Sequence, residues 1–462
     1  MGKGVTVICS LQRQLEPDRV GPEIIEPTFL QALSIKAGTA KTHRFQNLYG
    51  SLNESLLLEA WSTLNKKGAP GVDKVTIAQY GEHLGENIMK LVERLKGETY
   101  RSRLIRRKYI PKGNGKERPL GIPVVEDRLL QGAARLLLES IYEQDFLTCS
   151  YGYRPKVGAQ RAVKDLNYEL QFGRYGYVVE ADIKGFFDNI DHDWLLKMLK
   201  ERVDDKMFLS LIDSWLKAGI LERDGTVIHP HTGTPQGGVI SPILANIYLH
   251  YALDIWFERV VKSHCRGQAT IIRFADDFVC AFQFKEEAER FYRILPKRLA
   301  KFKLAVAPEK TCIHRFSRFH PSRARRFKFL GFEFYWETDS KGTPRVWRRT
   351  ARKKLRASIK ACRDWVKSHR HLPLRELIPK MIRKVRGHYN YFRAVGNVNS
   401  LWIFYREAVG TLYKWLNRRS QRRSLTWPGI KRVLVAYDFP TPDKRPIVQK
   451  PVADGKTVLL QV

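Results

Sequence analysis

The sequence predicts an α+β protein in which strand hairpins and helices are mixed through most of the chain and helices alone follow near the C-terminus. Two segments, 104–123 and 270–282, carry β-rich apolar runs on either side of a short turn, the pattern of a strand hairpin. Elsewhere apolar residues recur at helical spacing. At 462 residues with 43% apolar content, the chain can bury a sizeable core and form two or three domains.

The net charge indicates an anionic partner. The chain carries 82 Lys and Arg against 47 Asp and Glu, a formal charge of +35. Nucleic acid would offset this self-repulsion, and a membrane surface is the alternative. There is no run of about 18 uncharged apolar residues and no secretory signal, so we expect no membrane-spanning helix. The six cysteines form no Cys-x-x-Cys pair, which argues for reduced thiols in a cytosolic setting and against a zinc site or disulfide framework.

The positive charge is concentrated in residues 341–433. This segment holds 26 Lys and Arg but three Asp and Glu, and therefore 23 of the 35 excess charges. A solvated face normally mixes both signs, whereas here aromatic residues are interleaved with the cations. We predict helices at about 350–367, 374–392 and 399–420 that pack through these aromatics and face phosphates.

The first 147 residues alternate between loose and helical segments. Residues 1–45 are weakly patterned and punctuated by proline, so we expect a poorly ordered or loosely packed extension. Apolar spacing predicts helices at 52–64, 77–96 and 124–147. The Gly- and Pro-containing stretch 68–73 separates the first two helices as a loop.

The predicted hairpin 104–123 is rich in cations, with Lys108, Lys112, Lys116 and Arg118 beside aromatic residues. Lys and Arg on a rigid hairpin suit a triphosphate or a nucleic-acid backbone. A basic surface hairpin that binds nothing explains the same residues equally well.

An acidic residue ends the next predicted strand, 177–182, which follows a predicted helix at 159–172. Asp182 stands at the carboxyl end of that strand, where α/β sheets place their chemistry. A turn or capping role is the alternative. However, Asp191 or Asp193 is better placed to cap the helix that follows.

A glycine loop precedes another predicted helix. The residues Thr-Pro-Gln-Gly-Gly at 234–238 would let the backbone approach a ligand closely. Ser241 is predicted as the N-cap of the helix, with Pro242 as its first residue.

Two adjacent carboxylates, Asp276 and Asp277, form the predicted turn of the hairpin 270–282. They repel each other, and either exposure to solvent or a divalent cation beside them would relieve that repulsion. A helix at 286–302 and a short hairpin at 327–334 follow along the chain.

Together Asp182, Asp276 and Asp277 have the composition of a two-metal phosphoryl-transfer site. In such a site two divalent ions about 3.5–4 Å apart activate the attacking hydroxyl and stabilise the leaving group. Mg²⁺ suits the site because it binds one or two carboxylates together with substrate phosphates. The basic hairpin, the glycine loop and the basic helices supply the remaining contacts that such a reaction needs.

The chain resembles the group II intron-encoded reverse transcriptases and maturases over roughly residues 52–435. The resemblance rests on Phe-Ala-Asp-Asp at 274–277, Asp182 followed by Ile183 to Phe187, Thr-Pro-Gln-Gly-Gly at 234–238, Tyr-Gly-Tyr-Arg-Pro at 151–155, Pro-Glu-Lys-Thr at 308–311, Phe-Leu-Gly-Phe at 329–332, Gly-Ala-Pro-Gly-Val-Asp at 68–73 and Gly-His-Tyr-Asn-Tyr-Phe-Arg at 387–393. In this family the Phe-Leu-Gly-Phe box is the primer grip, and the 387–393 motif is the maturase or thumb signature.

The resemblance implies a right-hand polymerase that copies RNA into DNA by two-metal nucleotidyl transfer. It implies fingers and palm over 46–335, built from an antiparallel sheet with packed helices. A helical thumb or maturase domain over 336–433 and a C-terminal tail over 434–462 complete the expected organisation.

The resemblance also implies roles for single residues. Two Mg²⁺ ions, with Mn²⁺ as a possible substitute, would be held by Asp182, Asp276, Asp277 and the backbone carbonyl of Ile183. The same acids would be catalytic together with Lys310, which would donate a proton to the pyrophosphate or neutralise it. The incoming deoxynucleotide would contact Lys112, Arg118, Phe187, Gln236 and Gly237, with Phe187 as the sugar gate.

The expected partners are group II intron RNA, an RNA template with its DNA primer, deoxynucleoside triphosphates and target DNA. We expect a monomer or homodimer in the bacterial cytosol, near the nucleoid and not on a membrane. Phe274 stands where the family usually has Tyr. Phe lacks the hydroxyl but keeps the aromatic ring, so activity should survive. Beyond residue 433 there is no Cys-x-x-Cys pair or His-Asn-His pattern, so we expect no zinc-supported endonuclease.

Two other functions fit parts of the sequence. One is a non-enzymatic RNA-binding splicing factor with a relic active site, against which the intact set of acids argues. The other is a different bacterial reverse transcriptase used in defence or diversification.

Overall fold

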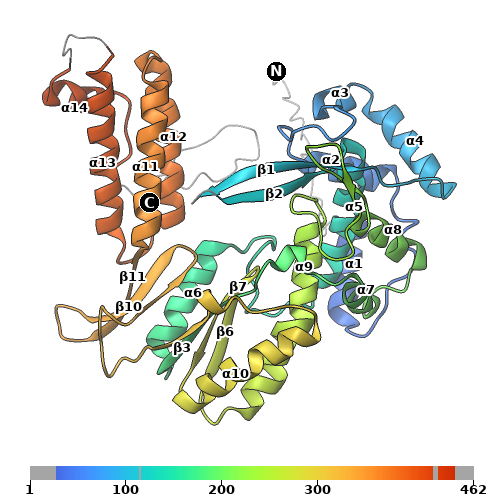
Figure 1. The fold of residues 1–462 in the computed structure, drawn as a ribbon, viewed down its shortest axis with the longest axis horizontal. Coiled ribbons are helices and arrows are strands. Elements are labelled where there is room, and N and C mark those ends of the chain that lie inside the picture. The colour runs from blue at the N-terminus through green and yellow to red at the C-terminus, as the bar shows by residue number, and fades with distance from the viewer. Residues whose placement is uncertain (1–27, 114–115, 420–424, 443–462) are drawn as a thin grey trace, which may run out of the picture.

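The computed structural model describes residues 28–113, 116–419 and 425–442 (Figure 1). Its helices and sheets confirm the predicted α+β class. The α-helices are α1 (Phe29–Thr39), α2 (Glu54–Thr63), α3 (Ile77–Glu82), α4 (Leu84–Lys96), α5 (Val125–Tyr142), α6 (Ala159–Phe172), α7 (His192–Lys200), α8 (Lys206–Leu216), α9 (Ser241–Leu249), α10 (Lys285–Lys301), α11 (Arg352–His369), α12 (Leu374–Phe392), α13 (Val398–Leu416) and α14 (Trp427–Ala436).

The strands are β1 (Ile105–Gly113), β2 (Lys116–Ile122), β3 (Tyr177–Asp182), β4 (Ile220–Leu221), β5 (Val227–Ile228), β6 (Ala269–Phe274), β7 (Asp277–Phe282), β8 (Cys312–Arg315), β9 (Arg326–Phe329), β10 (Phe332–Thr338) and β11 (Pro344–Thr350). Short 3₁₀ turns η1 (Phe186–Asp188) and η5 (Pro308–Lys310) and the π-helix η2 (His250–Asp254) lie near the candidate site.

The N-terminal region differs from the expectation of a loose extension over 1–45. Residues 1–27 lie outside the described residues. From Thr28 onward the chain forms α1, which begins with a capping box between Thr28 and Gln31. Ala37 is fully buried in the main core. The apolar residues of α1 surround the helix instead of following one face, so their spacing did not reveal it.

The predicted helix 77–96 is two helices, α3 and α4. Thr76 caps α3 through a capping box with Gln79, and the helix ends at His83, whose backbone leaves helical geometry at φ −120°. The chain therefore changes direction between two short helices that a periodic pattern cannot separate.

The hairpin 104–123 is confirmed as β1 and β2, paired antiparallel. Its sheet has the order β2-β1-β4-β5, and β1 pairs with β4 in parallel. Apart from this short parallel pairing, the sheet is antiparallel, in agreement with the predicted class.

The central sheet has the order β6-β7-β3-β8 and is antiparallel throughout. Because side chains alternate along a strand, the sheet contributes to two cores. Val179 and Phe278 belong to the core shared with α1–α5 and α7–α10, and Val178 and Val279 belong to the core shared with β9–β11 and α11–α14. The alternation places Asp182 and Asp277 on the second face, toward β9–β11.

The expected boundary between residues 335 and 336 falls inside β10. Strands β9, β10 and β11 form one sheet, so the all-helical part begins at α11. The three helices predicted in this region are present, and α14 follows them.

Figure 1 shows the central sheet at the base of the molecule, between the helices α1–α5 and α7–α8 on one side and α11–α14 on the other. The hairpin β1–β2 extends from the first group toward the second. Among the described residues, we find no helix with the length and apolar character needed to cross a membrane.

Candidate active site

The register of β3 and β7 brings two acids from distant parts of the chain face to face. Asp182, the last residue of β3, is the partner of Asp277, the first residue of β7. Phe274 pairs with Asp277 across the hairpin, so the turn consists of Ala275 and Asp276. The turn therefore begins one residue earlier than the predicted turn at Asp276 and Asp277. Ala275 has a left-handed φ of 56°, which turns the chain within two residues.

A buried ion pair supports this turn. Arg273 and Asp254 are both fully buried, with Arg273 Nη2 2.5 Å and Nε 2.7 Å from the two carboxylate oxygens. Arg273 Nη1 also donates to the carbonyl of Ala275 at 3.1 Å. The guanidinium therefore holds the residue whose backbone is left-handed.

The loop before α6 packs directly beneath the turn. A Cβ on Gly152 would lie 2.3 Å from the backbone nitrogen of Ala275, so only glycine fits there. The carbonyl of Gly152 accepts from Asn246 Nδ2 at 2.6 Å, and Asn246 Oδ1 accepts from Arg273 at 3.1 Å. Asp254 ends the π-helix η2, a deviation often found near functional sites.

Sequence reasoning did not identify Arg273, Asp254 or Asn246. One signal was present, because Arg273 is a charged residue inside the apolar run of β6 and must be paired if buried. Its partners could not be named, since they lie on an adjoining helix and its π-helical continuation.

The electrostatics of the three acids favour a cation. Asp277 is exposed as a residue, but neighbouring protein partly desolvates its carboxyl. This desolvation is the largest cause that raises the pKa of Asp277 to about 6, and repulsion from Asp182 and Asp276 adds to it. Burial, and after it repulsion from Asp182, also raises the pKa of Asp276. A bound divalent ion would remove this repulsion.

Lys310 already neutralises part of this charge. Its ammonium makes an ion pair with the Asp182 carboxylate, and that hydrogen bond raises the pKa of Lys310. Within the described residues, the oxygens of the three acids do not all lie within 4.8 Å of one another. The donors are nevertheless the hard oxygens that Mg²⁺ prefers, and substrate phosphates usually complete its shell.

The backbone carbonyl of Ile183 is turned toward the same edge. The amide of Ala307 donates to the Asp182 carbonyl at 2.8 Å, and the amide of Lys184 donates to the Ala305 carbonyl at 2.8 Å. Successive carbonyls of an extended strand point to opposite sides, so the Ile183 carbonyl faces away from residues 305–307 and toward the β7 side.

The turn after β3 carries Phe187 and joins it to the glycine loop. Gly185 has a left-handed φ of 55° and leads into η1. The amide of Thr234 donates to the Phe187 carbonyl at 2.8 Å. The Phe187 ring meets Tyr153 edge to face at 6.2 Å. This contact orients Phe187 beside the acidic turn that Gly152 supports.

The glycine loop also joins the hairpin β1–β2. The amide of Gly121 donates to the Gln236 carbonyl at 2.7 Å. A Cβ on Gly237, whose φ is 118°, would lie 2.5 Å from the carbonyl oxygen of Gly121. Gln236 Nε2 lies 3.5 Å from Asp188 Oδ1. The loop therefore spans from the turn after β3 to the hairpin.

Ser241 does not cap α9, contrary to the prediction. The N-cap is Ile240, and the Ser241 hydroxyl accepts from Thr234 Oγ1 at 2.7 Å and donates to the Pro235 carbonyl at 2.9 Å. Ser241 instead closes the glycine loop on itself, because its side chain turns back toward residues 234–235. By contrast, Asp191, one of the two residues predicted to cap the helix after β3, does cap α7, and its carboxylate accepts from the Trp194 amide.

The basic hairpin brings the positive charge of Arg118 near the acids. Arg118 lies on β2 opposite Ile110 and is exposed. Its charge lowers the pKa of Asp276, against the larger effect of burial. The side chain of Lys112 lies outside the described residues.

Helix α12 adds Tyr391, a residue of the 387–393 motif that was given no individual role from the sequence. Tyr391 donates its hydroxyl to the Leu330 carbonyl at 3.1 Å, and its ring stacks on Phe332 at 6.5 Å. Burial raises the pKa of Tyr391, and so does the charge of Asp277. The predicted primer grip and the 387–393 motif therefore meet at the edge of the acidic site.

Cations and aromatic rings are interleaved in the helical part, as the composition suggested. The Trp415 ring is approached by Arg370 at 5.0 Å and Lys367 at 5.7 Å, and the Trp365 ring by Lys384 at 5.0 Å. Lys367 and Lys384 are exposed and Arg370 is half-buried, so these charges remain accessible to an anionic partner.

Comparisons with known proteins agree with this geometry. The family model described as "Reverse transcriptase (RNA-dependent DNA polymerase)" matches residues 110–334. Group II intron-encoded protein LtrA of Lactococcus lactis subsp. cremoris is 47% identical over 166 residues, which cover 36% of this chain and 27% of LtrA. Nuclear intron maturase 4, mitochondrial, of Arabidopsis thaliana is 28% identical over 148 residues, covering 31% of this chain and 18% of that protein.

The match to LtrA therefore spans about a quarter of that relative's length. Protein YkfC of Escherichia coli (strain K12) is covered more fully: it is 34% identical over 279 residues, which are 54% of this chain and 73% of YkfC. The region matched by the family model includes both acidic strands and the glycine loop. The chain belongs to the reverse transcriptase family, in its group II intron-encoded branch.

Proposed function

We propose that the chain is an RNA-directed DNA polymerase that copies intron RNA into DNA and also binds intron RNA to assist splicing and mobility. The observation that carries the proposal is the register of β3 and β7. It sets Asp182 opposite Asp277, with Asp276 in a turn supported by the buried Arg273. A protein that only bound RNA would gain nothing from carboxylates that repel phosphate.

The acids would hold two Mg²⁺ ions, or Mn²⁺ in their place, together with the Ile183 carbonyl. Such ions lower the pKa of a primer hydroxyl and stabilise charge on the leaving pyrophosphate. The chain's own part is to orient the carboxylates of Asp182, Asp276 and Asp277. Lys310 would exchange its contact with Asp182 for the pyrophosphate, either neutralising it or giving it a proton.

The remaining predicted residues would position the substrates. Arg118 and Lys112 on the hairpin would bind the triphosphate. Gly237, with no side chain, would let the backbone approach the new base pair, next to Gln236. Phe187, held against Tyr153, would exclude a ribose 2′-hydroxyl.

The proposed partners are an RNA template with its DNA primer, deoxynucleoside triphosphates, group II intron RNA and target DNA. The charge of residues 341–433 supports a long anionic partner, since 23 excess positive charges lie there. The similarity to a group II intron-encoded protein and to an intron maturase supports intron RNA in particular.

Isosteric substitution of single acids tests the proposal. In Asp277→Asn and Asp276→Asn we expect primer extension on an RNA template to fall at least about a thousandfold, since a metal ion contributes several kcal/mol of charge stabilisation. Intron RNA binding, measured by filter retention, should stay unchanged. Asp213→Asn, on α8 beside Lys217, is the matched control and should extend normally.

Three outcomes would redirect the proposal. Extension that survives in Asp277→Asn would refute the assignment of the site. Tight intron RNA binding by a wild-type chain that never extends a primer would favour a splicing factor with a relic site. Extension without preference for intron RNA would favour a different bacterial reverse transcriptase, used in defence or diversification.

A further inference from the structure

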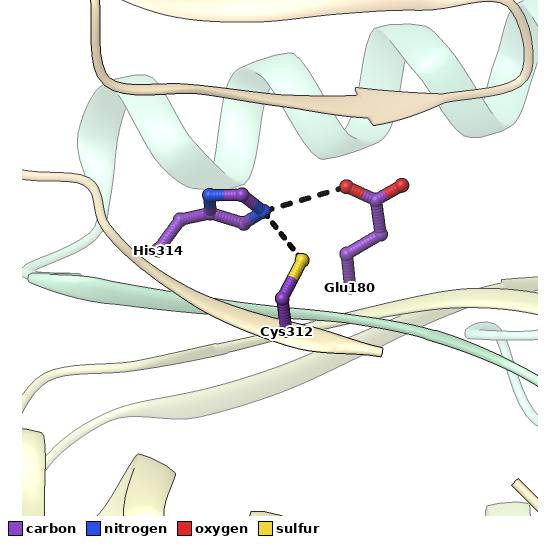
Figure 2. Close-up of side chains that lie close together, drawn as sticks. All are labelled: Glu180, Cys312 and His314. Carbon is purple, nitrogen blue, oxygen red and sulfur yellow. Dashed lines mark hydrogen bonds and ion pairs between the residues drawn. The ribbon is translucent and has the colours of Figure 1, made fainter. Parts of the chain in front are cut away.

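Three side chains with metal-binding atoms meet on the central sheet, apart from the proposed Mg²⁺ site (Figure 2). Glu180 lies on β3, and Cys312 and His314 lie on β8. Glu180 and Cys312 are register partners. His314 Nε2 lies 3.0 Å from Cys312 Sγ and 3.5 Å from Glu180 Oε2, and the three ligand atoms lie within 4.8 Å of one another.

We propose that Glu180, Cys312 and His314 bind one divalent cation of the zinc class, with a fourth position open to water or an external donor. Zinc accepts thiolate, imidazole and carboxylate together, and sites with three protein ligands normally keep an open position. A thiolate and an imidazole are poor partners for Mg²⁺, which prefers oxygen ligands. The site is therefore chemically separate from the three acids.

The neighbouring strand β9 orients two of the ligands. The amide of Lys328 donates to Glu180 Oε2 at 3.1 Å, leaving the other carboxylate oxygen for a cation. The His314 ring lies 6.4 Å from the Phe327 ring. Figure 2 shows the imidazole pointing its Nε2 between the thiol and the carboxylate. Partners of this kind fix ligand geometry in metal sites.

A cation can reach the site from solvent. Cys312 is exposed, and the side chains of Glu180 and His314 are each 26% exposed. Cys312 is a free thiol, as are the other cysteines of the described residues. The sequence argued against a zinc site because it has no Cys-x-x-Cys pair. Glu180 lies more than 130 residues before Cys312 and His314 and meets them only through the pairing of β3 with β8.

The site is one step along the sheet from a pair already described. Glu180 precedes Asp182 by two residues, and Cys312 follows Lys310 by two. A bound cation would cross-link β3 to β8 next to the ion pair of Asp182 and Lys310. Lys328, whose amide contacts Glu180, lies just before the predicted primer grip at 329–332.

Cobalt titration of the full chain tests the proposal, because Co²⁺ reports thiolate ligation by an absorption band in the near ultraviolet. We expect one Co²⁺ per chain with that band, displacement by Zn²⁺, and no displacement by millimolar Mg²⁺. Cys312→Ser should abolish the band. His314→Gln should weaken cobalt binding by more than about 100-fold, since even supporting residues of a metal site contribute about 10–100-fold.

The matched control is Cys265→Ser, which removes a half-buried thiol elsewhere in the fold and should keep the band. Thermal unfolding with and without Zn²⁺ gives a second measurement: zinc should raise the unfolding temperature of the wild type and leave that of His314→Gln unchanged. Absence of the band in the wild type, or its persistence in Cys312→Ser, would overturn the proposal.

Discussion

At the scale of single residues, the acidic turn is supported by buried side chains that lie beneath it. Arg273 joins the Asp254 carboxylate, the Asn246 amide, the Ser150 hydroxyl and the Ala275 carbonyl within a fully buried network. A buried charge is tolerated only when it is paired and its hydrogen bonds are satisfied. The planar guanidinium can serve all four partners at once, and an ammonium cannot.

Arg273→Lys should therefore separate charge from geometry. We expect the free energy of unfolding to fall by about 1–3 kcal/mol, from hydrogen bonds lost to buried partners. The turnover rate of primer extension should also fall, because the Ala275 carbonyl is no longer held. Chemical denaturation and single-turnover extension measure the two effects.

Arg202→Lys is the control for that substitution. Arg202 is nearly buried and pairs with Asp145 at 3.0 Å, on the side of the molecule that packs against α1. It should lose comparable stability and keep its turnover rate where it remains folded. Equal losses of turnover in both variants would contradict a positioning role for Arg273.

At the scale of elements, the site depends on close approach between backbone segments. The loop containing Gly152 lies beneath the acidic turn, and the loop containing Gly237 lies against β2. Both contacts are backbone against backbone, so neither can be relieved by moving a side chain. Each glycine therefore sets the distance between two elements that carry proposed site residues.

Gly152→Ala should displace the acidic turn. Its new Cβ would meet the Ala275 nitrogen at 2.3 Å, so the turn must move. We expect primer extension to fall by about 10-fold to 100-fold, since a shift of about 1 Å at reacting groups costs that much. Gly85→Ala, in α4 with no atom within 4 Å of its Cβ, should leave extension unchanged. Equal activity in both variants would contradict the role of the loop.

Helix α5 carries a buried acid whose titration should affect stability. Asp127 accepts from the Tyr100 hydroxyl at 2.7 Å and from the Arg103 amide at 3.1 Å, and burial raises its pKa to about 6 from an ordinary 3.8. The folded state therefore binds this proton more strongly than the unfolded state. The contribution of Asp127 to stability should fall as the pH rises from about 4 through 6.

Unfolding by denaturant at pH 5 and pH 7 checks that sign. Asp127→Asn loses about 1 kcal/mol at one hydrogen bond, but the pH dependence is the diagnostic quantity. The wild type should lose more stability than Asp127→Asn between pH 5 and pH 7. The same pH dependence in both proteins would contradict the raised pKa.

At the scale of the whole molecule, the central sheet separates two hydrophobic cores, and most of the excess positive charge lies in residues 341–433. Asp182 and Asp277 lie on the sheet face shared with β9–β11 and the basic helices. Tyr391 of α12 reaches the primer-grip turn at Leu330. A nucleic acid bound by the helices would therefore lie next to the proposed catalytic acids.

Binding of RNA should be strongly salt-dependent, because each neutralised phosphate releases a counterion. Replacing the exposed cations Lys353, Arg356 and Lys360 of α11 by Ala should reduce the slope of log affinity against log salt by about two to three. Fluorescence anisotropy over a range of salt concentrations measures this slope.

A triple control tests whether position or charge alone matters. Lys41, Lys90 and Lys217 lie in the opposite part of the molecule and already face carboxylates. Their replacement by Ala removes the same formal charge but should change the slope little. Equal slopes for the two triple variants would contradict binding by the helical part.

The sequence by itself determined most of the elements and the composition of the candidate site. Helical patterns located α2, α5, α6 and α10–α13, and alternation located the hairpins, because both are local properties of the chain. The two acidic segments and the glycine loop were likewise visible as residues next to predicted turns. Ser241 was wrongly predicted as a helix cap, since its hydroxyl can hydrogen-bond residues that precede it in the chain as well as the amides of the helix that follows.

Only the tertiary structure decided which distant residues meet. The register that joins Asp182 to Asp277 and the meeting of Glu180 with Cys312 and His314 both depend on strand pairing. The buried partners of Arg273 depend instead on how α9 and η2 meet the end of β6. Pairing is set by packing on both faces of the sheet, and a shift of one residue would turn every one of these side chains to the other face. No local pattern in the sequence records that choice.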